Sequence, residues 1–195
     1  SGADLGDAAL ISNYAAGIAI EKRGTYTVKL KELKDKIFSE DKKIVELDEL
    51  IWKIEDLKRK KKKIVWTNGC FDLLHIGHVK YLKEAKKFGD VLVVGLNSDE
   101  SVKKLKGSTR PIQTEKERAE ILSSLEFVDY VIIFPEDTSE KYNSALKPEL
   151  YVKGSDYRVE QMLNHPEGKA VKQHGGEIKT IQLVDGRSTT KILET

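Results

Sequence analysis

Residues 63–78, KIVWTNGCFDLLHIGH, decide the fold that we predict for this chain. The stretch begins with an apolar run, passes through the turn-forming pair Asn68-Gly69 and enters a helix that carries His75 and His78. The first backbone amides of a helix have no partner inside the helix, so they are free to bind an anion such as phosphate. We therefore predict a strand, a phosphate-binding turn and the N-terminus of a functional helix.

Apolar strands alternate with helical segments downstream of this stretch. We expect strands at 64–67, 91–97, 130–134, 150–153 and 178–183, and helices at 78–88, 115–125 and 139–146. Runs such as VLVV and YVII are apolar at consecutive positions, which is typical of strands that are covered on both faces. The pattern predicts an α/β fold with a doubly wound parallel sheet that binds its ligands at the carboxyl ends of the strands.

The chain upstream of this domain, which we place at 63–195, divides into two segments. Residues 1–40 contain an Ala-rich helix that ends at Gly24, and residues 25–28 are expected to form a short strand. Residues 41–62 read as a lead-in helix and linker, with apolar residues at helical spacing. The AAGIAI helix and the tail after it resemble the end of a ribokinase-type sugar kinase; an ordinary helical extension is the alternative. The ATP-binding loop and catalytic base of such a kinase would lie upstream, so we expect no kinase reaction here.

Composition sets the class of protein. The chain has 195 residues, 39% of them hydrophobic, and a net charge of +2, so no global field attracts nucleic acid. We interpret the basic run 58–63, KRKKKK, as a solvated helix end. Cys70 is the sole cysteine, and no apolar stretch has the length of a membrane span. We expect a cytoplasmic protein with no membrane or nucleic-acid partner.

Three polar clusters each follow a predicted strand: TNGCFDLLHIGH at 67–78, VKGSDY at 152–157 and DGRSTTKI at 185–192. In a doubly wound sheet the carboxyl ends of the strands meet at one edge, so these clusters should converge on one cleft. In the last cluster Arg187 offers a planar donor for phosphate, and hydroxyl residues at 188–190 can cap a helix.

His75 and His78 are three positions apart, so both should lie on one side of the first helical turn. Gly77 between them allows a nucleotide close to the backbone. The pair could donate hydrogen bonds to phosphoryl oxygens as charge develops there; a helix cap or a metal pair are the alternatives. Cys70 is read as structural, with a thiolate nucleophile as the alternative. His165 and His174 are expected at the surface.

Residues 63–195 resemble the cytidylyltransferase-like nucleotidyltransferase family, whose motifs stand here as GCFD, HIGH and GRSTTKI. Within the family, the segments TNGCFDLLHIGHVKYL, VGLNSDESVKKLKGSTRPI, LYVKGSDY and DGRSTTKI are similar to the adenylyltransferase half of bifunctional heptose kinase/adenylyltransferases of lipopolysaccharide core synthesis. The kinase-like segment upstream fits the same bifunctional parent, whose remaining kinase domain would then be a partner.

The resemblance implies transfer of AMP from ATP to D-glycero-β-D-manno-heptose 1-phosphate, giving ADP-heptose and pyrophosphate on a Rossmann-like domain. It implies a Mg²⁺ held mainly by the ATP triphosphate; protein ligands of the metal stay unknown. It assigns catalysis to His75, His78, Lys106 and Arg187. It assigns nucleotide binding to Cys70, Phe71, Asp72, Gly77, Lys104, Gly154, Asp156, Tyr157, Gly186, Ser188, Thr189 and Thr190.

Several alternatives stay open. Glycerol-3-phosphate cytidylyltransferases and FMN adenylyltransferases share the HIGH-like and STT motifs, and a non-catalytic nucleotide-sensing module is a rival of another class. Lys104 and Lys106 could be solvated lysines of a loop, and Arg110 could bind the sugar phosphate or hold a turn. The polar segment 155–168 is expected to be a surface loop on the substrate side. Whether the chain forms a homodimer is open.

Overall fold

The computed structural model describes residues 5–22, 24–37, 42–155 and 157–182. They fall into two units, Ser1–Lys42 and Lys43–Thr195. No helix in the described ranges is long and apolar enough to cross a membrane.

The first unit contains two helices, α1 (Leu5–Ile20) and α2 (Leu30–Ile37), so the predicted N-terminal helical segment is confirmed. The strand predicted at 25–28 is wrong. A strand needs a partner to satisfy its backbone, and the described residues of this unit contain no other strand. Side-chain bonds hold this connection instead, because Glu32 accepts from the Tyr26 hydroxyl at 2.6 Å and from the Lys29 amide at 3.1 Å.

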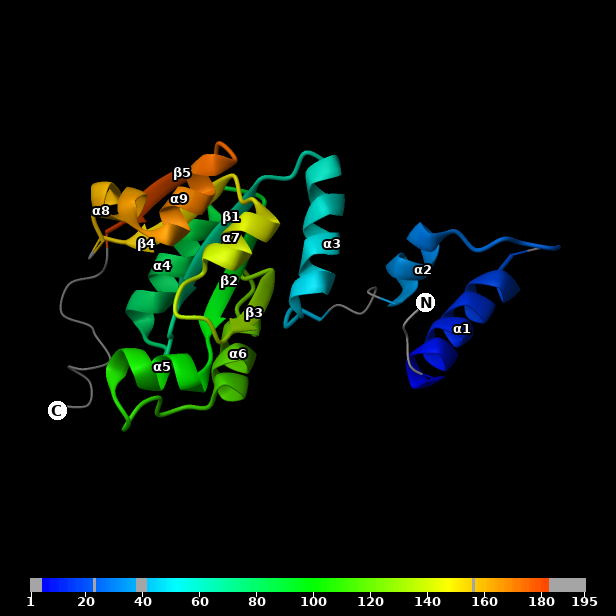
Figure 1. The fold of residues 1–195 in the computed structure, drawn as a ribbon, viewed down its shortest axis with the longest axis horizontal. Coiled ribbons are helices and arrows are strands. Elements are labelled where there is room, and N and C mark those ends of the chain that lie inside the picture. The colour runs from blue at the N-terminus through cyan, green and yellow to red at the C-terminus, as the bar shows by residue number, and fades with distance from the viewer. Residues whose placement is uncertain (1–4, 23, 38–41, 156, 183–195) are drawn as a thin grey trace. The chain divides into compact units, whose positions relative to one another are not determined.

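Five parallel strands form the centre of the second unit (Figure 1). They are β1 (Ile64–Gly69), β2 (Val91–Asn97), β3 (Tyr130–Phe134), β4 (Leu150–Gly154) and β5 (Glu177–Ile181). Their order is β3-β2-β1-β4-β5, which confirms the predicted doubly wound sheet. The chain moves outward from β1 through β2 to β3 and then returns to β4 on the other side, so a topological switch point lies between β1 and β4.

Helices cover both faces of this sheet, because its strands are apolar at consecutive positions. Ile64 and Trp66 of β1 pack on one face and Val65 packs on the other. The first face is covered by α3 (Leu47–Arg59), α7 (Glu140–Leu146), α8 (Val159–Asn164) and α9 (Pro166–Gln173). The second is covered by α4 (Ile76–Lys86) and α6 (Glu115–Ser123). The lead-in helix predicted within residues 41–62 is confirmed as α3, which buries Leu50 and Ile54 in the core.

Two segments that we expected to be loops are helical. Residues 103–107, KKLKG, lie at the end of α5 (Asp99–Lys106), which Ser98 caps by accepting from the Ser101 amide at 3.2 Å. Most of the polar segment 155–168 folds as α8 and the start of α9, with Pro166 in the first turn of α9. Each of these three helices buries only one to three residues, so their sequences look like loops.

Candidate active site

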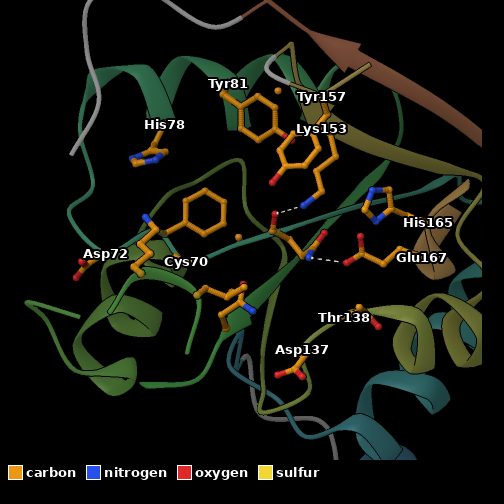
Figure 2. Close-up of a pocket in the computed structure, with 17 residues that line it drawn as sticks. Cys70, Asp72, His78, Tyr81, Asp137, Thr138, Lys153, Tyr157, His165 and Glu167 are labelled. Carbon is orange, nitrogen blue, oxygen red and sulfur yellow. Dashed lines mark hydrogen bonds between the residues drawn. The ribbon is translucent and has the colours of Figure 1, made fainter. Parts of the chain in front are cut away.

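A pocket of about 540 Å³ opens at the carboxyl ends of β1, β2 and β4 (Figure 2). From the first predicted cluster it is lined by Asn68, Gly69, Cys70, Phe71, Asp72 and His78. From the second it is lined by Lys153, Gly154 and Tyr157. The convergence predicted for these two clusters is therefore present, and the volume is that of a small-molecule site. The third cluster, with Gly186, Arg187, Ser188, Thr189 and Thr190, lies outside the described residues, as does Asp156.

The GCFD turn is held in a sharp conformation. Phe71 has a positive φ of 43°, a left-handed backbone that a side chain adopts only when its surroundings enforce it. The Arg118 guanidinium donates to the Cys70 carbonyl at 2.6 Å, which anchors the residue before the turn. The Phe71 ring is buried, and packs edge-on against the His78 imidazole with the ring centroids 5.3 Å apart.

Asp72 anchors the other end of the turn. Its buried carboxylate pairs with the Arg110 guanidinium through Oδ2 at 2.5 Å and accepts from the Ile112 amide through Oδ1 at 2.7 Å. Both oxygens are therefore engaged by the loop between α5 and α6. For Arg110, this geometry supports the turn-holding role over a role in binding the sugar phosphate.

The two histidines of the HIGH segment lie at the N-terminus of α4 with their rings stacked 3.8 Å apart. His75 is the N-cap, and its Nδ1 accepts from the Gly77 amide at 3.1 Å. The Nδ1 of His78 in turn accepts from the His75 amide at 3.4 Å. Both rings therefore accept from backbone amides at the start of the helix. The helix-cap alternative is therefore realised at the start of α4.

His78 is neutral at physiological pH. Burial lowers its pKa from 6.5 to about 4, with further lowering by the proximity of His75 and Lys106, although a hydrogen bond with the Leu73 backbone raises it in part. The imidazole lines the pocket, so it presents an uncharged hydrogen-bond donor there.

The remaining predicted residues separate into those that line the pocket and those that do not. Lys106, in the last turn of α5, lines it. Lys104 points elsewhere, because it is exposed and pairs with Glu100 at 3.3 Å. His75 and the buried Gly77 shape the helix start but do not line the pocket.

Cys70 is poorly suited to act as a nucleophile. Burial raises the pKa of its thiol, although Lys106, Arg118 and Lys153 lower it in part. The thiol is therefore protonated at neutral pH, and the geometry favours the structural interpretation.

An aromatic and cationic group lines the pocket at the end of β4 (Figure 2). The Lys153 ammonium donates to the Asn68 carbonyl at 3.1 Å and lies 5.0 Å from the centre of the Tyr157 ring. Tyr157 is 43% exposed, so part of its ring is accessible to a ligand.

Sequence reasoning missed several residues of the site. Arg118 of α6 is fully buried beneath the pocket. It lies four positions before the buried Leu122, and a charged residue on this apolar helix face could have indicated it from the sequence. Asp137, Thr138, His165 and Glu167 also line the pocket. His165 is exposed, as expected, and it was missed as a pocket residue. Their neighbours in the sequence carry no comparable signal.

The described residues contain no group of three or more His, Cys, Asp or Glu side chains that could hold a metal ion. The metal-pair alternative for His75 and His78 therefore lacks a third ligand in this part of the chain.

Comparison with known proteins places these features in context. The sequence profile of the Cytidylyltransferase-like family matches residues 66–194. The chain is 48% identical to the Bifunctional protein HldE of Citrifermentans bemidjiense and 50% identical to that of Geobacter metallireducens. In both cases the match covers 99% of this chain and 40% of the relative, so the chain spans about two fifths of the length of these proteins.

Two solved structures share the fold. A lipopolysaccharide core biosynthesis protein from Thermoplasma volcanium is 31% identical, with a TM-score of 0.52 over 63% of this chain and 97% of that chain. The pantoate-beta-alanine ligase of Francisella tularensis is 18% identical, with a TM-score of 0.50 over 75% of this chain and 68% of that chain. The second likeness concerns the fold alone.

Proposed function

Because the chain belongs to the cytidylyltransferase-like family, we propose that it transfers AMP from ATP to D-glycero-β-D-manno-heptose 1-phosphate, giving ADP-heptose and pyrophosphate for lipopolysaccharide core synthesis. The observation that carries the proposal is the convergence of His78, Lys106 and the end of β4 on one pocket. The similarity to HldE proteins and to the Thermoplasma volcanium protein supports the choice of acceptor.

The reaction is a single displacement. An oxygen of the sugar phosphate attacks the α-phosphorus of ATP, and the bond from that phosphorus to the pyrophosphate oxygen breaks on the opposite side. Negative charge develops on the phosphoryl oxygens and on the leaving pyrophosphate. No covalent enzyme intermediate is required.

His78, which is neutral at physiological pH, contributes a hydrogen bond to these oxygens. His75 orients that ring through the stacked contact and the helix cap. Lys106 supplies positive charge beside His78. Arg187 with Ser188, Thr189 and Thr190 is assigned to the β- and γ-phosphates by the family motif.

The adenine base is assigned to the end of β4. Gly154 brings the backbone close to the ligand and the exposed ring of Tyr157 offers a stacking surface. Asp156 and Gly186 are assigned to the same nucleotide by motif.

Mg²⁺ is proposed to enter as part of the ATP complex. It would neutralise charge on the triphosphate, and Mg²⁺ commonly binds through substrate phosphates and water. Asp72 is a poor ligand for it, because both of its oxygens are engaged by Arg110 and Ile112.

A pyrophosphate-release assay tests the proposal. ATP and CTP are each combined with heptose 1-phosphate, with glycerol 3-phosphate and with FMN, in the presence of Mg²⁺. We expect release with ATP and heptose 1-phosphate only. Turnover with CTP and not with ATP would instead favour a cytidylyltransferase, transfer to FMN an FMN adenylyltransferase, and nucleotide binding without any turnover a sensing module.

The HldE relatives carry the word bifunctional in their name, and the chain spans 40% of each. We propose that residues 1–40 correspond to the end of the sugar kinase half in such a protein.

A further inference from the structure

One wall of the pocket is polar and acidic. It is formed by Asp137 and Thr138, from the loop after β3, and by His165 and Glu167, from the start of α9. Figure 2 shows these four side chains on the side of the pocket away from His78. We call this set the polar wall.

Three side chains of the polar wall have no partner among the described residues. No described residue forms a hydrogen bond or ion pair with the side chains of Asp137, Thr138 or His165. A carboxylate, a hydroxyl and an imidazole therefore face the pocket with their hydrogen-bonding capacity available to a ligand.

The fourth member is fixed firmly to the sheet. Glu167 Oε1 accepts from the side-chain amide of Asn68 at 3.3 Å and from the backbone amide and hydroxyl of Ser139 at 3.0 and 3.1 Å. Asn68 is held in turn by the Tyr151 hydroxyl, which donates to its Oδ1 at 2.7 Å. This network connects the start of α9 and the loop before α7 to the end of β1, so the wall is preorganised for binding.

Charge divides the pocket into two regions. Lys106 lies near His78, whose pKa it lowers, and Lys153 lies against Tyr157. Asp137 and Glu167 would repel a phosphate placed against the polar wall. Phosphates therefore belong on the side of Lys106 and His78, and the polar wall suits a neutral ligand group that is rich in hydroxyls.

The nucleoside has a different place in this pocket. Its base is assigned to Tyr157, and its α-phosphate must lie beside His78, so its ribose lies between these two residues. Figure 2 shows both of them away from Asp137 and Thr138. The group that remains to occupy the polar wall is the sugar of the acceptor.

We propose that the polar wall binds the hydroxyl groups of the acceptor sugar and selects a sugar 1-phosphate over phosphate monoesters with fewer hydroxyls. A carboxylate can accept hydrogen bonds from two neighbouring hydroxyls at once, which suits the vicinal hydroxyls of a pyranose. The proposal rests on the proposed function and identifies the residues that choose its acceptor.

Steady-state kinetics of Asp137→Asn, Thr138→Val and His165→Gln test this inference. The acceptor, heptose 1-phosphate, is varied at saturating ATP, and ATP is varied at saturating acceptor. For Asp137→Asn we expect the acceptor KM to rise about tenfold, the scale of a lost hydrogen bond to a charged group, with the KM for ATP changing less than twofold. Preference for heptose 1-phosphate over glycerol 3-phosphate should fall in parallel.

Glu140→Gln is the matched control. Glu140 carries the same charge on the first turn of α7, is exposed and does not line the pocket. Its kinetics should equal those of the wild type. Equilibrium binding of heptose 1-phosphate to the wild type and to Asp137→Asn gives a second readout that does not depend on turnover.

The outcomes separate the two proposals. A rise in the KM for ATP with the acceptor KM unchanged would place the ribose at the polar wall and overturn the inference, as would wild-type kinetics in all three variants. In both cases the adenylyltransferase function would stand. A wild-type chain that neither binds nor adenylylates heptose 1-phosphate would overturn both proposals.

Discussion

Removal of the Arg118 guanidinium should destabilise the protein strongly. The side chain is fully buried and donates to the Cys70 carbonyl at 2.6 Å, the Asn97 carbonyl at 2.8 Å and the Gln113 carbonyl at 3.0 Å. It also pairs with the Asp99 carboxylate at 2.7 Å. Arg118→Met keeps most of the apolar stem and removes every donor.

The magnitude follows from what is left behind. Each carbonyl that loses its donor in the interior costs roughly 1–3 kcal/mol. Asp99 is 30% exposed in its side chain, so its carboxylate can be hydrated again and adds little. Relief from burying a cation offsets part of the loss. We therefore expect a decrease of about 3–5 kcal/mol in the free energy of unfolding, the range for breaking a buried ion pair, and a melting temperature about 10 °C lower.

Urea and thermal unfolding of the wild type and Arg118→Met provide the measurement. Arg59→Met is the control, because Arg59 is 58% exposed and its pair with Asp56 lies at the surface. That control should lose less than about 1 kcal/mol. A similarly small loss in Arg118→Met would refute the view that this guanidinium holds the strand ends under the pocket.

Three further predictions concern catalysis, pH and packing. His78→Ala should lower kcat by about 100-fold or more, the scale of a lost transition-state donor, and unchanged turnover would remove His78 from the mechanism. Because the folded-state pKa of His78 lies near 4, below its ordinary 6.5, the unfolded chain binds the extra proton between these values. The free energy of unfolding should therefore decrease as the pH falls from 6.5 towards 4 and be independent of His78 above 6.5; identical pH profiles for the wild type and His78→Gln would contradict this. Gly168→Ala should lower the melting temperature, because the added Cβ would lie 2.0 Å from the Met162 carbonyl oxygen. An unchanged melting temperature would show that α8 can shift to make room for the Cβ with no loss of stability.

The strands were predictable because their signal is local. The segments 91–97 and 130–134 are apolar at nearly every position, and the structure has strands with these bounds. The sheet is covered on both faces, so neither strand needed a polar alternation to be recognised. The turn predicted at Asn68-Gly69 was placed too early, because both residues are the last of β1 and pair with β2, and the left-handed turn residue is Phe71.

The helices α5, α8 and α9 were missed because their stability comes from contacts outside themselves. α5 is rich in lysine and buries only Ser101 and Val102, so its sequence resembles a solvated loop. At 25–28 the error is the opposite, since a strand was predicted and none is present. Its origin is again a dependence on contacts outside the segment. The apolar and β-branched residues there favour a strand, but no neighbouring strand is available among the described residues of that unit.

By itself the sequence determined the parallel sheet, the helix that begins at the HIGH segment, and the meeting of that segment with the end of β4. Hydrophobic periodicity and turn residues act over a few neighbouring positions, and the order of the elements then dictates which strand ends share an edge. Only the tertiary structure decided that Arg118 lies under the pocket, that Lys104 faces Glu100, and that Asp137 and His165 face the site. These placements depend on contacts between segments that are far apart in the chain, where packing and hydrogen bonding select one direction for each side chain and local sequence does not.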